Sequence, residues 1–101
     1  MWIVVFFDLP TNTNVERKRA SNFRLSLLKN GFSMFQYSVY MRPCPSPESM
    51  TVHKNRISHM IPAAGHVSVV SLTDKQYGLI ENFIGLLPAK MAAAPNQLEM
   101  L

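Results

Sequence analysis

The sequence predicts an α+β fold in which two helices cover one face of a mostly antiparallel sheet. Three observations lead to this prediction. An unbroken β-branched and aromatic run at residues 2–7 is typical of a buried strand. A capped amphipathic segment at 13–30 is typical of a helix that packs on a sheet. Residues 32–72 then repeat the alternation of strand and helix, and 101 residues suffice for one such domain but not for two.

The first strand and the first helix are the best-defined elements. No polar residue interrupts the strand at 2–7, which predicts a central position in the sheet with both faces buried. Thr13 is the expected N-cap of the helix, with Glu16 reaching back to it in a capping box. The helix runs to about Asn30, where Gly31 supplies a left-handed stop. Three residues share the arc expected to face the sheet: Ala20, Phe23 and Leu27.

Two short strands, a second helix and a further strand are expected next. Residues 32–42 are extended, and Gln36-Tyr37-Ser38 at their middle indicates a bend or tight hairpin. A second helix, capped by Ser46, continues until Pro62. Residues 66–72 carry the apolar pattern of another strand.

The C-terminal part is expected to add short elements. A turn or one helical turn is expected at 73–76, followed by a strand at 79–84 and a short terminal strand at 97–101. We therefore divide the chain into a domain at 1–85 and a C-terminal tail at 86–101. The element order is that of the ferredoxin-like βαββαβ arrangement with additional C-terminal strand or strands. Because its first strand is strongly apolar, we expect a homodimer packed through the sheets.

Composition narrows the class of function. Ten Lys and Arg residues against six Asp and Glu residues give a net charge of +4, a bias toward nucleic-acid partners. The single Cys44 excludes an intrachain disulfide framework and zinc sites built on cysteine pairs. No run approaches the roughly 18 apolar residues of a membrane span, and the first apolar run lacks the basic leader of a signal peptide. We expect a cytoplasmic protein that does not insert into a membrane.

Asp8 is the leading candidate for chemistry, because it ends the first strand and precedes a proline-containing loop. Rigid backbone at a strand end can fix a carboxylate that holds Mg²⁺, which uses one or two carboxylates together with waters and phosphate oxygens. Two Asp8 side chains across a twofold axis would make a better site than one. Such a metal would serve the cleavage of a phosphodiester. Alternatively, Asp8 only begins the turn that follows it.

Basic and aromatic residues suggest a nucleic-acid surface. The first helix holds five of the ten basic residues and a single acid, a concentration that suits a phosphate backbone, although a solvated helix face is the alternative. The candidate binding residues are Arg17, Lys18, Arg19, Arg24 and Arg42. Aromatic residues at 35, 37 and 40 could stack nucleobases, but we favour core positions for them. Ser38 could bond near Asp8 if the first and second strands are neighbours. The three histidines show no metal-binding spacing.

Several motifs resemble a known family, the small CRISPR-associated nucleases of the adaptation machinery (the "Cas-two" family). The resemblance is sharp over residues 3–42 and looser over 66–76. The segment Asp8-Leu9-Pro10-Thr11 with Glu16-Arg17-Lys18 resembles the branch that accompanies single-effector (type II) systems. The other matching residues are Val4-Val5-Phe6-Phe7, Phe23-Arg24, Leu27-Leu28, Gly31-Phe32, Gln36 and Ser38-Val39-Tyr40.

The resemblance implies a ferredoxin-like homodimer that acts as a Mg²⁺-dependent endonuclease on RNA or double-stranded DNA, with Asp8 of both protomers as catalytic metal contact. It also implies a structural role in spacer acquisition, in which the dimer bridges dimers of the "Cas-one" integrase and its basic flanks hold duplex DNA. Leu25, Leu28 and the tail are candidates for docking that partner, and the tail would pair with the partner protomer's sheet.

Two other functions remain open from the sequence. One is a non-catalytic DNA-binding scaffold of the integration complex, in which the basic residues act and Asp8 chemistry is not needed. The other is a ferredoxin-like toxin RNase or a small-ligand sensor. Genomic context separates the last hypothesis, because it predicts no neighbouring repeat array or integrase gene.

Overall fold

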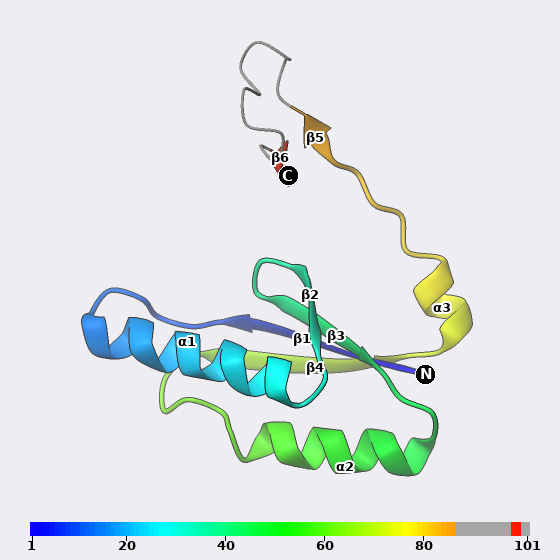
Figure 1. Cartoon of the computed structure of the whole chain (residues 1–101), viewed down its shortest axis with the longest axis horizontal. Coiled ribbons are helices and arrows are strands. Elements are labelled where there is room, and N and C mark those ends of the chain that lie inside the picture. The colour runs from blue at the N-terminus through cyan, green and yellow to red at the C-terminus, as the bar shows by residue number, and fades with distance from the viewer. Residues whose placement is uncertain (87–97, 100–101) are drawn as a thin grey trace.

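Four antiparallel strands form the main sheet of the computed structural model, in the order β2-β3-β1-β4 (Figure 1). The structure describes residues 1–86 and 98–99. The strands of the sheet are β1 (Trp2–Asp8), β2 (Ser33–Gln36), β3 (Val39–Pro43) and β4 (His66–Leu72). Strand β1 pairs with both β3 and β4, so the central position predicted for it is confirmed. The order is that of the ferredoxin-like arrangement.

Two helices, α1 (Asn14–Lys29) and α2 (Pro47–Ser58), lie on the same side of this sheet (Figure 1). Side chains of a strand alternate between its two faces, so every second residue of β1 points toward the helices. The buried core formed there includes Ile3, Val5, Phe7, Phe23, Leu27, Met50 and Ile57. Burying each large apolar side chain of this kind stabilises the fold by about 1.5–3 kcal/mol.

Helix α1 has the boundaries and the buried arc that its sequence predicts. The hydroxyl of Thr13 accepts the Glu16 backbone N–H at 3.1 Å, and Oε1 of Glu16 accepts the Thr13 N–H at 2.9 Å. Gly31 follows the helix with a φ of +84°, which confirms the left-handed stop. The predicted arc of Ala20, Phe23 and Leu27 is buried.

Helix α2 is shorter than predicted, because it ends at Ser58 instead of continuing to Pro62. The backbone N–H groups of His59 and Met60 donate to carbonyls three residues earlier, at 3.1 and 3.0 Å, which tightens the last turn. The residue before a proline avoids helical backbone angles, so the helix has to stop before Pro62.

The strand predicted at 79–84 is wrong. A short helix α3 (Asp74–Gly78) occupies the place of the predicted helical turn, and residues 80–84 have no regular secondary structure. The next strand is only β5 (Gly85–Leu86). Leu79 and Phe83 are 70% and 79% exposed, so an apolar run resembled a strand here without a sheet edge or core to receive it.

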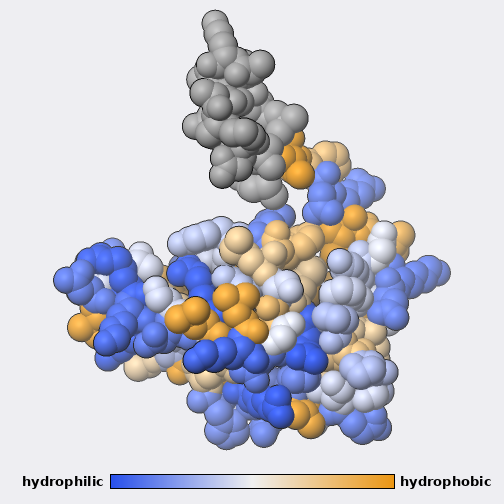
Figure 2. Space-filling view, viewed as in Figure 1, coloured by the Kyte–Doolittle hydropathy of each residue, from blue (hydrophilic) through white to orange (hydrophobic). Residues whose placement is uncertain are grey.

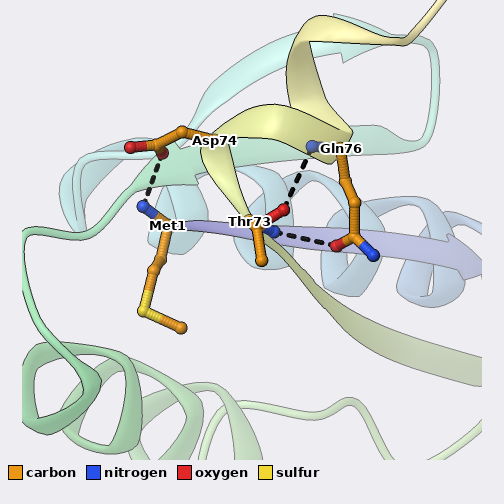
Figure 3. A network of polar contacts seen from close by, with 4 residues as sticks. All are labelled: Met1, Thr73, Asp74 and Gln76. Carbon is orange, nitrogen blue, oxygen red and sulfur yellow. Dashed lines mark hydrogen bonds and ion pairs between the residues drawn. The ribbon is translucent and has the colours of Figure 1, made fainter.

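Helix α3 is attached to the first residues of β1 (Figure 3). The α-amino group of Met1 lies 2.6 Å from Oδ1 of Asp74. Thr73 and Gln76 form a capping box that begins the helix. The ring of Tyr77 stacks on Trp2, with the ring centroids 3.7 Å apart. This contact covers one end of the sheet face that the two long helices leave open.

The open face of the sheet is only partly covered in the single chain, and the burial of this face by a second copy, which the sequence predicts, stays a prediction. Trp2, Val4, Phe6 and Asp8 point to this face, opposite the core residues. Val4 is 7% exposed, but Phe6 is 44% exposed and Asp8 is exposed as well. Within one chain, α1 and α2 cover only the other face of the sheet.

The C-terminal end forms a separate pair of strands, in which β5 is antiparallel to β6 (Leu98–Glu99). This pair is not part of the four-stranded sheet (Figure 1). Most of the expected C-terminal tail at 86–101, including most of the terminal strand predicted at 97–101, lies outside the described residues. The domain boundary at 85 and the pairing of the tail with a partner's sheet therefore stay predictions. Within the described residues, no helix has the length and hydropathy needed to cross a bilayer.

Candidate functional site

Asp8 lies at the last position of β1 with an exposed side chain on the open face of the sheet. The alternation along the strand places it there, two residues after Phe6. Its backbone is held in register by β4, in which His66 is its cross-strand partner. The carboxylate is therefore presented from a fixed strand end, as the sequence predicted.

An open hollow of about 310 Å³ surrounds this strand end. Its walls come from the ends of β1 and β4 and from the β2–β3 hairpin. The lining residues are Phe6, Phe7, Asp8, Ser38, Val39, His66 and Ser68. One carboxylate, two hydroxyls and one imidazole thus line a hollow on an otherwise largely apolar face, which is the pattern of a binding site for a polar ligand.

Ser38 reaches this hollow from the turn between β2 and β3. The contact between Ser38 and the Asp8 region was expected only if the first and second strands were neighbours. They are not, because β3 lies between β2 and β1. Instead, the Ser38 carbonyl accepts the Phe7 backbone N–H at 3.1 Å, which ties the turn to β1. Ser38 has a φ of +67°, a strained value for a residue other than glycine.

His66 and Ser68 are site residues that the sequence did not predict. Nε2 of His66 lies 3.4 Å from the hydroxyl of Ser68, and both residues line the hollow beside Asp8. Histidine spacing along the chain does not reveal them, because the site forms across two strands. The antiparallel pairing of the first and last strands of a ferredoxin-like sheet would have placed residue 66 opposite residue 8.

The metal-binding side chains around Asp8 are too few for a site made by protein ligands alone. Within the described residues, no group of three or more His, Cys, Asp or Glu side chains could hold a metal ion. Asp8 supplies one carboxylate, and Mg²⁺ commonly takes one or two carboxylates while waters and phosphate oxygens complete its shell. Asp8 therefore fits a largely hydrated Mg²⁺ or one shared with a second carboxylate.

The candidate basic residues of α1 divide between two flanks and the outer face. Arg17 donates to the Thr11 carbonyl at 2.9 Å and to the side chain of Asn14. Arg24 lies farther along the same flank, over the ring of Tyr37. Lys18 is exposed, and Arg19 lies on the opposite flank beside Pro62. Strongly hydrophilic side chains gather over the end of the molecule where α1 begins (Figure 2).

Arg42 does not join these residues. It lies on β3 opposite Ile3, so it points to the helix-covered face. Its guanidinium donates to the carbonyl of Asn30 at the C-terminus of α1, and its Nε is buried. A cation is favourable at a helix C-terminus. The structure thus gives Arg42 a contact inside the fold, and its binding of nucleic acid stays a prediction.

The aromatic residues near the site differ from one another in burial. Tyr40 is 4% exposed and belongs to the core, as predicted. Tyr37 is 77% exposed at the tip of the β2–β3 hairpin, so the core position favoured for it is wrong. Its place in a turn, one residue before Ser38, explains the exposure, because a hairpin tip has no layer above it.

Comparisons with known proteins agree with the resemblance seen in the motifs. The family described as "CRISPR associated protein Cas2" matches residues 1–80. A protein of Flavobacterium psychrophilum named "CRISPR-associated endoribonuclease Cas2" is 50% identical over 100 residues, covering 99% of this chain and 87% of that protein. A protein of the same name from Parvibaculum lavamentivorans is 42% identical, covering 99% of each.

The fold is also similar to that of a solved structure. The crystal structure of Streptococcus pyogenes Cas2 at pH 6.5 superposes with a TM-score of 0.64 and 21% sequence identity, covering 82% of this chain and 99% of that one. At this identity the likeness supports the fold alone. With the family match over residues 1–80 and the relatives that align along almost the whole length, the chain belongs to the Cas2 family of CRISPR-associated proteins.

Proposed function

We propose that the chain is a Mg²⁺-dependent endoribonuclease of the CRISPR adaptation machinery that acts as a homodimer. The observation that carries this proposal is the position of Asp8, which is exposed at a fixed strand end in a hollow with Ser38 and His66. The names of the relatives, which call them endoribonucleases, support the reaction class.

The open face of the sheet supports the homodimer. Phe6 and Val70 are 44% and 42% exposed on this face, an amount of apolar surface that a second sheet would cover. A twofold axis through such an interface makes the same patch serve both protomers. Asp8 ends the strand that carries Phe6, so the packing of two open faces would bring a second carboxylate toward the same region.

In this function, Asp8 would hold the metal, and a second Asp8 from the partner protomer would add the other carboxylate. Mg²⁺ would supply Lewis-acid stabilisation of charge on the phosphate and activation of a water. The hydroxyls of Ser38 and Ser68 can donate hydrogen bonds to phosphate oxygens and so orient the strand in the hollow. The basic residues of α1, with Arg17 and Arg24 on the flank beside the hairpin, would hold the rest of the phosphate backbone.

A second candidate function is a non-catalytic scaffold of spacer integration, of the kind that accompanies type II systems. The charge of α1 favours it. Glu16 is the only acid of this helix, and its carboxylate already accepts the backbone N–H groups of Asn12 and Thr13. The helix thus presents positive charge to duplex DNA without a neutralising partner of its own. The integrase would dock on another surface, for which the exposed Leu25 and Leu28 are candidates.

Replacement of Asp8 by Asn tests the first function. Purified wild-type and Asp8→Asn proteins are incubated with end-labelled RNA and with duplex DNA, in Mg²⁺ and in EDTA. We expect Asp8→Asn to lower the Mg²⁺-dependent cleavage rate by about 10²–10³-fold, the scale for losing one group that stabilises a transition state. Asp74→Asn is the matched control, since Asp74 is the only other aspartate and lies at the opposite end of β1.

The same variant separates the two functions in cells that carry the complete integration system. If spacer acquisition continues with Asp8→Asn while cleavage by the purified protein is lost, the scaffold role is independent of the nuclease. If acquisition is lost although the variant folds and assembles, the scaffold-only function is excluded. Equal cleavage by Asp8→Asn and wild type would refute the proposed active site.

A further inference from the structure

The tip of the β2–β3 hairpin presents an aromatic ring that neither the core nor the proposed metal site uses. Tyr37 is 77% exposed. The guanidinium carbon of Arg24 lies over its ring, 4.7 Å from the centroid. Because the guanidinium is attracted to one face of the ring and Tyr37 is largely exposed, the opposite face of the ring is open to solvent.

This ring is held in place relative to the Asp8 hollow. Arg24 also lies 5.7 Å from the ring centroid of Phe7, the neighbour of Asp8 on β1. Ser38, the next residue after Tyr37, is tied to the Phe7 backbone and lines the hollow itself. Two contacts, one through a side chain and one through the backbone, therefore connect the exposed ring to the strand that ends at Asp8.

The surroundings of the ring are positively charged. Arg17 lies on the same flank of α1 as Arg24, and within residues 1–86 neither arginine forms an ion pair with a carboxylate. Stacking on an aromatic ring recognises the face of a nucleobase, while nearby guanidinium groups attract its phosphates. An acidic peptide would match the charge but would leave the open face of Tyr37 without a partner.

We propose that Tyr37, backed by Arg24, is a stacking site for an unpaired base of the strand whose phosphate lies in the Asp8 hollow. The proposal rests on the proposed function, because it places a nucleic acid at Asp8. The bases inside a duplex already stack on their neighbours, so only an unpaired base can offer its face to Tyr37. The site would then favour single-stranded over duplex substrate at the point of cleavage.

Binding in EDTA tests the site apart from cleavage. Fluorescence anisotropy measures the affinity of wild type, Tyr37→Ala, Tyr37→Leu and Tyr37→Phe for a labelled single-stranded RNA and for the same RNA paired with its complement. Base–aromatic stacking is worth about 1–3 kcal/mol per base, which corresponds to roughly 5- to 150-fold in affinity. We expect Tyr37→Ala and Tyr37→Leu to lose affinity for single-stranded RNA by that factor, while their affinity for the duplex changes by less than about twofold. Tyr37→Phe should bind both RNAs nearly as wild type does.

A spectroscopic signal distinguishes stacking from a general effect on folding. RNA containing 2-aminopurine should lose fluorescence when it binds wild type or Tyr37→Phe, because stacking quenches this base, and should lose much less with Tyr37→Ala. Equal affinity of Tyr37→Ala and wild type, or equal weakening of single-stranded and duplex binding, would overturn the stacking site. Asp8→Asn, measured in parallel, separates the two proposals. It should lose cleavage but retain the quenching. If Asp8→Asn still cleaves RNA, the active site is refuted while the stacking site is not.

Discussion

Gly65 is the residue whose replacement by alanine most directly tests how the Asp8 strand end is positioned. Gly65 has a φ of +108°, outside the range that other residues adopt without strain. A Cβ atom there would lie 2.9 Å from the Asp8 carbonyl oxygen and 2.6 Å from a methyl carbon of Leu9. The close approach of the α2–β4 loop to the Asp8–Leu9 backbone thus depends on the missing side chain.

The cost of Gly65→Ala can be worked from these two features. Overpacking against a closed neighbour costs about 1–3 kcal/mol, and an unfavourable backbone angle costs about 1–3 kcal/mol. Because one clashing atom is backbone, rotation of a side chain cannot relieve the contact. We expect the free energy of unfolding to fall by roughly 2–4 kcal/mol and the melting temperature to fall by at least about 10 °C.

Two other glycines provide matched controls for calorimetry. Gly31 has a similar φ of +84°, but a Cβ there would meet the flexible end of Arg42, so Gly31→Ala should cost less. At Gly78 no atom lies within 4 Å of the place that a Cβ would take, and alanine there should be neutral or slightly stabilising. In cleavage assays well below the melting temperature, Gly65→Ala alone should lower kcat with RNA affinity unchanged. A melting temperature within about 2 °C of wild type would refute the steric reasoning.

Three further predictions concern the dimer, the pH dependence and a helix cap. Phe6→Lys places a charge on the open face and should give a monomer in light scattering. The control Leu25→Lys, on the outer face of α1, should leave the dimer intact. A dimeric Phe6→Lys protein would exclude packing through the sheets. Burial and, to a lesser extent, two nearby arginines lower the pKa of His53. The neutral imidazole therefore contributes to the free energy of unfolding in full above the unfolded pKa of about 6.5, and this contribution is lost as the pH falls below that value. The melting temperature of wild type should fall with pH in this range, and that of His53→Gln should not. If the melting temperature of His53→Gln depends on pH as wild type does, His53 is not the cause. Thr13→Ala should lower the free energy of unfolding by about 1 kcal/mol in urea titration, since it removes the α1 cap, and an unchanged midpoint would contradict that role.

The elements that local chemistry determines were predictable from the sequence. The capping box of Thr13 and Glu16, the stop at Gly31 and the central apolar strand each depend on neighbouring residues, and all three are present. The strand predicted at 79–84 was wrong, because an apolar run forms a strand only where a sheet edge accepts it. For Tyr37, composition alone could not tell a core aromatic from one at a hairpin tip.

The candidate site could be predicted only in part, for the same physical reason. Asp8 was identifiable because its signal, a carboxylate ending an apolar strand, is local. His66 and Ser68 join it through the register between β1 and β4, which are separated by more than half of the chain. A pairing of that kind has no signature in the spacing of residues, and it requires the topology of the sheet.

The contact between Arg42 and the end of α1 changes what the net charge of this chain means for a polyanion. Arg42 counts toward the formal charge of +4, yet its guanidinium binds Asn30 inside the fold. Part of that charge offsets the negative end of a helix dipole and adds little to the electrostatic potential outside the molecule. Two relatives of equal net charge can therefore differ in how fast they capture nucleic acid, and the informative comparison is which face of the sheet each arginine occupies.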